Sequence, residues 1–346
     1  MIMQINDFVK KNDPQDQFSV LKNSYKQIES AWNNNPQFKN LGKPDVNKII
    51  ISGLGGSAIS ADLLKNYLQH DLKIPLITNR DYFLPAFADR KTLVIVSSYS
   101  GNTEETISVF KQAISKKCRI VAVASGGVIS ELAKKNKIPL ITIEPGFQPR
   151  YALGLSFFTL LKLLQSMKLI PKEDKNVSQI KNLWKKKGMD LSEENNAALS
   201  IAEMLVGHVP IIYSAEGSTS AVGYRFKCQL NENSKMHAFH NSIPEMNHNE
   251  IIGWETFREK NLRTKVITIL DTGYHPQVKK RFKIVTELIH KSGAGVVELK
   301  SSQKNFKVRI MDLIYLIDWI TFYLAVLRGF DPSEIDYIHE LKNRLG

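Results

Sequence analysis

A ten-residue stretch, "SSYSGNTEET" from Ser97 to Thr106, carries five serine and threonine side chains beside a glycine and an asparagine. The apolar run "KTLVIV" precedes it and the amphipathic run "ISVFKQAI" follows it, which predicts a strand, a turn and a helix. The start of such a helix offers unpaired backbone N–H groups and the positive end of the helix dipole, and both favour an anion. Because hydroxyls donate hydrogen bonds without adding charge, Ser98, Ser100 and Thr103 predict a site for a small phosphate monoester. The chain has no GxxxxGK[ST] motif, so a P-loop that grips a nucleoside triphosphate is not expected.

A helix cap is the alternative interpretation of this turn. Asn102 followed by Glu105 fits a capping box, but a cap leaves Ser98, Ser100 and Thr103 without a role. A second small-residue turn, "GLGGSA", follows the strand "KIIIS", although such turns also serve close packing of a helix on a strand. The two turns together favour phosphate binding over capping alone.

A carboxylate and an imidazole offer acid–base chemistry in the second half of the chain. Glu232 stands at the end of a predicted helix and His248 follows after "IPEMN". Their unperturbed pKa values, about 4.3 and 6.5, would provide a base and an acid at moderately acidic pH. We interpret His237 and His240 as structural, because "KMHAFH" alternates like a strand. A metal site made of these two histidines and His248 is a weaker alternative, since the ligand spacing is loose and no cysteine assists.

Alternating strand and helix patterns must position these groups. Apolar runs such as "KIIIS", "LVIVSS" and "RIVAVAS" alternate with helical patterns, which predicts parallel sheets flanked by helices. The pattern also repeats, because residues 49–68 align without gaps on residues 211–230, with Ser52 on Ser214 and Gly55 on Gly217. Further along, "RTKVITI" mirrors "KTLVIV", but "LDTGYHP" follows it in place of the hydroxyl-rich turn. We therefore expect one copy to bind phosphate and the other to have a different task.

The repeat predicts an α/β protein with two similar units, each a doubly wound, flavodoxin-like parallel sheet flanked by helices. We place a helical N-terminal extension at 1–40, the first unit at 41–150, a helical connection at 151–194, the second unit at 195–300 and C-terminal helices at 301–346. The last of these helices is expected to carry Pro332 in its first turn.

Composition limits the class of protein. The chain has 346 residues, of which 43% are hydrophobic and 23% charged, as is usual for a soluble globular protein. The N-terminus lacks the apolar stretch of a signal peptide, and the two cysteines suggest neither disulfides nor a metal site. The apolar segment "IMDLIYLIDWITFYLAVL" contains Asp312 and Asp318, which would be costly in lipid, so we expect a buried core helix and no membrane association. These features predict a cytoplasmic protein.

The net charge has two interpretations: an attraction for anionic partners, or a lysine-rich surface exposed to solvent, which the scattered lysines favour. The formal net charge is +13, which favours anionic ligands. The lysines are scattered apart from "WKKKG", and we find no helix-turn-helix pattern, no RNP motif and no zinc finger. We therefore expect no nucleic-acid partner.

Five motifs in a fixed order carry a family resemblance: "GLGGSA", "SSYSGNTEET", "QPRYALG", "NENSK" and "PEMNHNE". From about residue 45 to the C-terminus the chain resembles the bifunctional phosphoglucose/phosphomannose isomerase family, a branch of the sugar isomerase (SIS) domain superfamily. The resemblance implies two SIS subdomains. It also implies interconversion of glucose 6-phosphate or mannose 6-phosphate with fructose 6-phosphate, without a metal or another cofactor.

The resemblance also implies roles for particular residues. Glu232 matches the base that carries a proton between C1 and C2, and Arg150 matches the arginine that stabilises the enediolate. A fixed guanidinium suits an anionic intermediate because its charge is permanent. The positions that match phosphate-binding residues are Gly56, Ser57, Ser98, Ser100 and Thr103.

Ring opening and subunit organisation are implied in the same way. His248 matches a residue that opens the sugar ring and comes from the neighbouring subunit, which predicts a homodimer. Lys342 matches a C-terminal lysine that assists ring opening. The resemblance also implies a small hydroxyl residue in this tail for members that accept mannose phosphate, where the present chain has Ile335, with Ser333 nearby. The glucose activity is therefore expected more firmly than the mannose activity.

Two other functions fit parts of the sequence. One is a SIS isomerase for a pentose phosphate or an amino-sugar phosphate, which the doubled unit and the "NHN" motif disfavour. The other is a sugar-phosphate sensor, which usually has a DNA-binding segment before a single SIS domain. The first 40 residues are too few for such a segment and lack its pattern.

Overall fold

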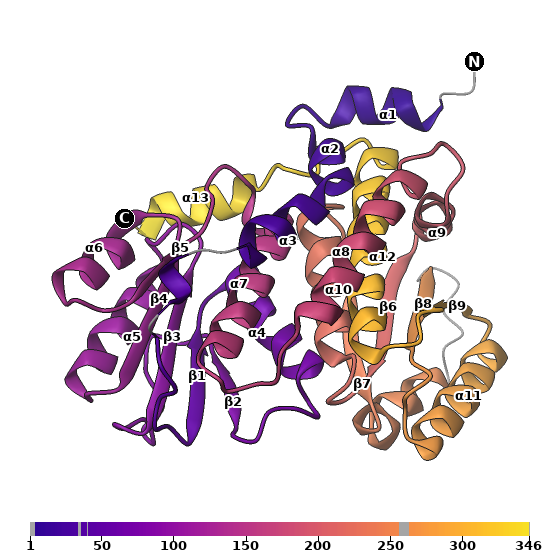
Figure 1. Cartoon of the computed structure of the whole chain (residues 1–346). Helices are drawn as coiled ribbons and strands as arrows, with labels where there is room; N and C mark the ends of the chain where they lie inside the picture. The colour runs from indigo at the N-terminus through magenta and orange to yellow at the C-terminus, as the bar shows by residue number, and fades with distance from the viewer. Residues whose placement is uncertain (1–3, 34–35, 40, 256–262, 346) are drawn as a thin grey trace. The chain divides into compact units, whose positions relative to one another are not determined.

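The computed structural model describes residues 4–33, 36–39, 41–255 and 263–345, and the chain divides into two compact units (Figure 1). The first unit is Ser24–Lys181. The second unit combines Met1–Asn23 with Asn182–Gly346. Each is an α/β unit with one parallel sheet, as the sequence predicted.

The first unit contains a five-stranded sheet in the order β2-β1-β3-β4-β5. This is the flavodoxin-like winding, in which the order reverses beside β1. All seven residues of β3 are buried, as expected for a central parallel strand covered on both faces. The strands are β1 (Lys48–Ser52), β2 (Leu76–Asn79), β3 (Thr92–Ser98), β4 (Arg119–Ala124) and β5 (Leu140–Thr142).

Helices cover both faces of this sheet. Phe110 of α5 and Ile129 of α6 pack in one core cluster with Val94 of β3. Tyr67 of α4 meets Phe157 of α7 edge to face, with ring centroids 5.3 Å apart. The helical segments are α3 (Ser24–Trp32), η1 (Pro36–Phe38), α4 (Gly55–Tyr67), α5 (Glu104–Ser115), α6 (Gly127–Lys135), η2 (Pro149–Tyr151), α7 (Leu153–Ser166) and α8 (Asp174–Asp190), whose last turns belong to the second unit.

The second unit has a four-stranded sheet in the order β7-β6-β8-β9, which repeats the winding of the first. Helix α11 packs Phe282, Val285 and Ile289 on one face of the sheet. The strands are β6 (Val209–Ala215), β7 (Phe239–Ile243), β8 (Thr264–Leu270) and β9 (Gly295–Lys300). The helical segments are α1 (Ile5–Asn12), α2 (Gln17–Lys22), α9 (Ala197–Leu205), α10 (Ser220–Glu232), η3 (Glu245–His248), η4 (Glu250–Trp254), α11 (Pro276–Lys291), α12 (Phe306–Leu327) and α13 (Asp336–Leu345).

Helix α12 is the apolar segment that the sequence placed in the core. It is long and apolar enough to cross a membrane, but 89% of its most apolar stretch is buried inside the protein. Its two carboxylates are paired: Asp318 with Arg225, and Asp312 with Lys187. The prediction of a buried core helix is confirmed.

Helix α10 ends at Glu232, as the sequence predicted, three residues later than α4 ends on the alignment of 49–68 with 211–230. The structure corrects two local predictions. The strand predicted over "KMHAFH" begins only at Phe239, because the chain after α10 first makes a turn in which Lys235 has a left-handed backbone (φ 49°). Helix α13 begins at Asp336, so Pro332 lies before the helix and not in its first turn.

Candidate active site

The hydroxyl-rich turn lies at the carboxyl end of β3, where it leads into α5 (Figure 1). The hydroxyls of Ser98 and Thr103 hydrogen-bond to each other at 2.9 Å, and the Gly101 N–H donates to Ser98 Oγ at 3.1 Å. The Asn102 N–H donates to Ser100 Oγ at 3.3 Å. These bonds fold the loop into a compact turn that brings three hydroxyls and two backbone N–H groups together.

The capping interpretation of this turn is wrong. Helix α5 begins at Glu104, and its N-cap residue, Thr103, makes no side-chain cap hydrogen bond. Asn102 is engaged elsewhere, because its Oδ1 accepts from the Val128 N–H at 3.1 Å. The Glu104 carboxylate accepts from Tyr82 Oη at 3.1 Å. No side chain caps the start of α5, which leaves this helix end suited to an anion.

Gly101 is required for the shape of the turn. Its backbone is left-handed (φ 74°), and a Cβ atom there would lie 1.9 Å from the Gly126 carbonyl oxygen. Any other residue would therefore push the turn away from the loop that precedes α6. The glycine of "SGNT" is explained by this close approach.

The second small-residue turn lies beside the first. Strands β1 and β3 are paired, and a Cβ on Gly53 would lie 2.8 Å from the Ser97 carbonyl oxygen. Helix α4 begins at Gly55 without a side-chain cap, and Ser57 is buried in its first turn. Two uncapped helix starts thus meet at the carboxyl edge of one sheet, where open α/β sheets bind ligands.

The backbone of η2, which carries Arg150, packs beside the start of α4. A Cβ on Gly56 would lie 2.8 Å from the Pro149 carbonyl oxygen, so only glycine lets this segment approach α4 so closely. Arg150 is only 4% exposed, and its guanidinium lies 5.6 Å from the centre of the Tyr151 ring. The first unit therefore gathers all six candidates that the sequence placed in it: Gly56, Ser57, Ser98, Ser100, Thr103 and Arg150.

In the second unit, Glu232 is the last residue of α10. Arg225 and Gln229, which precede it on the same helix, both bind the Asp318 carboxylate of α12. Asn233 donates to Thr321 Oγ1 at 3.0 Å. These bonds join α10, and the residue that follows it, to α12, so they hold the helix that ends in Glu232 in place.

The chain that follows Glu232 is held by two cations. The Lys235 ammonium donates to the Glu232 carbonyl at 3.1 Å, to the Asn233 carbonyl at 3.3 Å and to the Asp331 carbonyl. Arg328 donates to the Ser234 carbonyl. Both side chains bind carbonyls close to the carboxyl end of α10, where positive charge is favourable.

His248 ends η3 and is exposed. Its segment is anchored on either side, by the buried Met246 and by Glu250. The Glu250 carboxylate accepts from Tyr213 Oη and from Asn241 Nδ2, both at 2.7 Å. Met246 and Glu250 are held by packing and by hydrogen bonds, whereas the His248 side chain faces solvent. Sequence reasoning assigned no role to Tyr213, Asn241 or Glu250, and only the acidic end of "NHNE" gave a signal for them.

The other histidines are placed separately. His240 Nε2 and Ser214 Oγ hydrogen-bond at 2.7 Å, and burial lowers the pKa of His240 to about 4, with a smaller effect from Lys227. This agrees with a structural role for His240. Within the described residues, the possible ligand atoms of His237, His240 and His248 do not lie together. Those of Glu334, Asp336 and His339 lie within 4.8 Å of one another, on the exposed tail.

The candidate residues of the C-terminal tail differ in how far they are buried. Lys342 lies in α13, which has no buried residue. Ser333 is buried, and its N–H donates to Asp331 Oδ1 at 2.7 Å, whereas Ile335 is partly exposed. Ser333 is therefore the tail hydroxyl that the fold encloses.

Comparison with known proteins identifies the family. Residues 194–345 match the model of the bacterial phospho-glucose isomerase C-terminal SIS domain. The chain is 39% identical over 333 residues to a bifunctional phosphoglucose/phosphomannose isomerase of Caldicellulosiruptor bescii, covering 95% of this chain and 98% of the relative. It is 35% identical over 301 residues to the Aquifex aeolicus protein of the same name, covering 86% and 90%.

The fold is also similar to that of solved structures. The structure matches a hypothetical protein of Thermus thermophilus with a TM-score of 0.77 at 16% identity, covering 98% of this chain and 92% of that one. At this identity the match supports the fold alone. The sequence relatives settle the family: this chain belongs to the bifunctional phosphoglucose/phosphomannose isomerase family.

Proposed function

We propose that this protein is an aldose–ketose isomerase that interconverts glucose 6-phosphate, mannose 6-phosphate or both with fructose 6-phosphate. Family membership carries this proposal, because relatives named for this activity match the chain over most of its length. The compact hydroxyl-rich turn at the end of β3 supports the proposal, because its hydroxyls could bind the phosphate that all three sugars share.

The phosphate would anchor the substrate in the first unit. Ser98, Ser100 and Thr103 can donate from their hydroxyls, and the uncapped starts of α4 and α5 add backbone N–H groups. Ser57 adds a further hydroxyl. Holding the substrate by its phosphate leaves C1 and C2 free to react with the catalytic groups. The binding energy of the phosphate also orients these two carbons for the reaction.

Isomerisation requires removal of a proton beside a carbonyl and its return one carbon away. Glu232 would take and return this proton on one face of a cis-enediol. Arg150 would stabilise the negative charge that develops on oxygen, because a guanidinium stays charged at every working pH. His248, assisted by Lys342, would open the ring, since imidazole accepts and donates protons near neutral pH.

The exposure of His248 bears on the assembly of the protein. We propose a homodimer in which His248 of each subunit completes the site of the other; its anchored segment and solvent-facing side chain support this arrangement. The acid–base set is entirely organic, so the proposed reaction needs no metal or organic cofactor. We also propose a cytoplasmic location, where sugar phosphates are found.

Coupled assays test the function. Fructose 6-phosphate formation from glucose 6-phosphate and from mannose 6-phosphate should be measured on the full chain, with and without EDTA. We expect turnover of at least one sugar and no effect of EDTA. Turnover only of a pentose phosphate or an amino-sugar phosphate would refute the proposed substrate. Loss of activity in EDTA with recovery on adding zinc would refute metal independence.

A further inference from the structure

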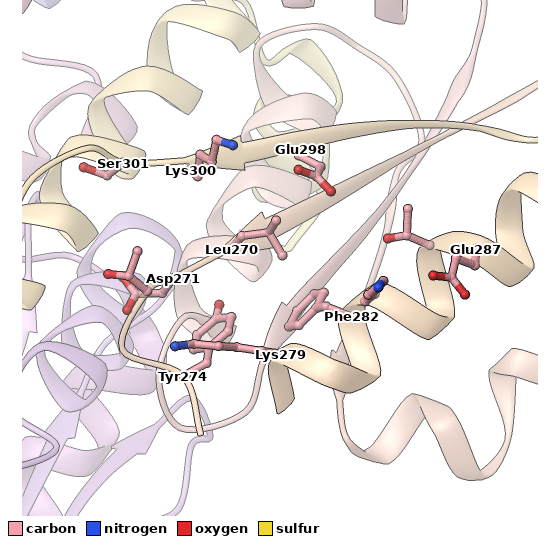
Figure 2. A pocket seen from close by; sticks show the side chains of 12 residues that line it. Leu270, Asp271, Tyr274, Lys279, Phe282, Glu287, Glu298, Lys300 and Ser301 are labelled. Atoms are coloured by element: carbon pink, nitrogen blue, oxygen red, sulfur yellow. The ribbon is translucent and has the colours of Figure 1, made fainter. Parts of the chain in front are cut away.

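A pocket of about 500 Å³ opens in the second unit, between α11 and the carboxyl ends of β8 and β9 (Figure 2). Its volume suits a small organic molecule. The turn "LDTGYHP" forms part of its wall. This turn follows β8 as the hydroxyl-rich turn follows β3 in the first unit. None of the candidate catalytic or phosphate-binding residues lines the pocket.

The pocket exists because the layer between α11 and the sheet is filled at one end only. Val296, at the start of β9, packs in the core cluster with Val285 and Ile289 of α11. Further along β9, on the same face of the strand, Glu298 and Lys300 stand in place of apolar side chains. Because Glu298 and Lys300 do not pack as apolar side chains would, the space between them and α11 stays open and is lined by polar groups.

The end of the pocket near the strand carboxyl ends is cationic. Lys279 of α11 and Lys300 of β9 line it, with Lys283 one turn after Lys279. No ion pair or side-chain hydrogen bond occupies these three ammonium groups among the described residues. The Asp271 carboxylate at this end is already neutralised, because Arg309 Nε and Nη2 donate to it at 2.6 and 3.0 Å. Free positive charge therefore remains for an anion.

The middle of the pocket is apolar and its far end is acidic. Leu270 and Phe282 lie between the two ends, and Glu287 and Glu298 lie away from Asp271 and Ser301 (Figure 2). A flat apolar group suits the space between a leucine and a phenylalanine ring. Ionised carboxylates accept hydrogen bonds and donate none, so a ligand group that donates, such as an amino or hydroxyl group, fits that end.

We propose that this pocket is a second ligand site that takes a phosphate monoester with a flat, apolar body and hydrogen-bond donors at its far end, the chemistry of a purine mononucleotide. Lys279 and Lys300 hold the phosphate, Leu270 and Phe282 contact the ring, and Glu298 accepts from its donors. The site is distinct from the hydroxyl-rich turn, which has hydroxyls and no lysine.

Calorimetric titration of the full chain tests the site, with AMP as the probe. Saturating fructose 6-phosphate is added first, so that the proposed substrate site is occupied. We expect one AMP per chain, with adenosine and ribose 5-phosphate each binding more weakly by about tenfold or more, because each lacks one end of the ligand. Inorganic phosphate is titrated in the same way and should bind more weakly still.

Two exposed lysines supply a matched pair of variants. Lys300→Glu should weaken AMP binding by about tenfold or more, the loss expected for a charge-assisted hydrogen bond. Lys291→Glu, at the end of α11 and outside the pocket, should bind AMP as the unaltered chain does. Isomerase activity without AMP should be the same in both variants, since neither residue belongs to the proposed catalytic set.

Three results would overturn the proposal. The first is no AMP binding to the chain with fructose 6-phosphate bound. The second is equal AMP affinity in the two lysine variants. The third is equally tight binding of ribose 5-phosphate, which would show that the apolar body contributes nothing.

Discussion

Arg225 and Asp318 form a buried two-point ion pair between α10 and α12, with Arg225 Nε 3.0 Å from Oδ1 and Nη2 2.9 Å from Oδ2. Both side chains are less than a tenth exposed. Gln229 donates to the same carboxylate at 2.9 Å, so three residues in two helices share one charge network. The network holds α10, and therefore Glu232 at its end.

Removing the Asp318 charge should destabilise the protein strongly. Asp318→Asn leaves the Arg225 charge buried without its counterion, and breaking a buried pair in this way costs about 3–5 kcal/mol. Urea unfolding should show this loss, whereas Asp190→Asn, at an exposed position, should change stability by less than about 0.5 kcal/mol. The double variant Arg225→Met with Asp318→Leu should recover most of the loss. A single variant as stable as the unaltered chain would show that the pair contributes nothing.

Glu232→Gln should abolish most of the isomerase activity. The substitution keeps the size of the side chain and removes its basicity, and general-base catalysis contributes typically about 10²–10⁴-fold. Turnover and solvent-deuterium incorporation at C2 should fall together, while the affinity for the sugar phosphate changes little. Glu203→Gln on the exposed face of α9 is the matched control. Near-normal exchange of the C2 proton in Glu232→Gln would remove Glu232 from the mechanism.

Loss of the hydroxyls at the end of β3 should affect binding more than chemistry. Ser98→Ala combined with Thr103→Val removes two hydroxyls that hydrogen-bond to each other at 2.9 Å. We expect KM for fructose 6-phosphate to rise by about tenfold or more, since bonds to a charged phosphate contribute about 1.5–3 kcal/mol each. Ser115→Ala, at the far end of α5, should leave KM unchanged. A fall in kcat with constant KM would argue against a phosphate site.

Subunit exchange tests the shared site. Glu232→Gln and His248→Ala should each be inactive as separate proteins. If His248 serves the neighbouring subunit, a mixed dimer regains one intact site, and an exchanged mixture should recover about a quarter of the normal activity for random pairing. The extent of exchange is measured with differently tagged chains. Exchange without recovery would place His248 and Glu232 in the same subunit's site.

His240 should make the native state less stable in acid. Burial lowers its pKa to about 4, whereas the unfolded chain titrates near 6.5, so the unfolded state binds one more proton between these values. The contribution to stability is present above about pH 6.5 and is lost as the pH falls toward 4, by about 3 kcal/mol at most. Urea unfolding of His240→Gln should depend less on pH in this window than the unaltered chain. His290→Gln, exposed at the end of α11, should keep the full pH dependence.

Local sequence patterns determined much of the fold. Continuous apolar runs such as "LVIVSS" predicted central parallel strands, and the structure buries every residue of β3. The alignment of residues 49–68 with 211–230 predicted two similar sheets, and both have the same winding. These features are readable because the burial of a strand on both faces leaves a direct mark on its composition.

The tertiary structure decided what no local pattern could. The turn after Glu232 is held by bonds from Lys235 to the Asp331 carbonyl and from Arg328 to the Ser234 carbonyl, and these pairs, far apart in the sequence, meet where α12 packs on α10. The alternative of a cap at Asn102 fails because Asn102 Oδ1 accepts from the Val128 N–H, in the first turn of α6. The pocket beside β9 likewise arises from how far α11 covers the sheet. Each of these depends on contacts between distant residues, so the sequence supplies the groups while packing decides which of them meet.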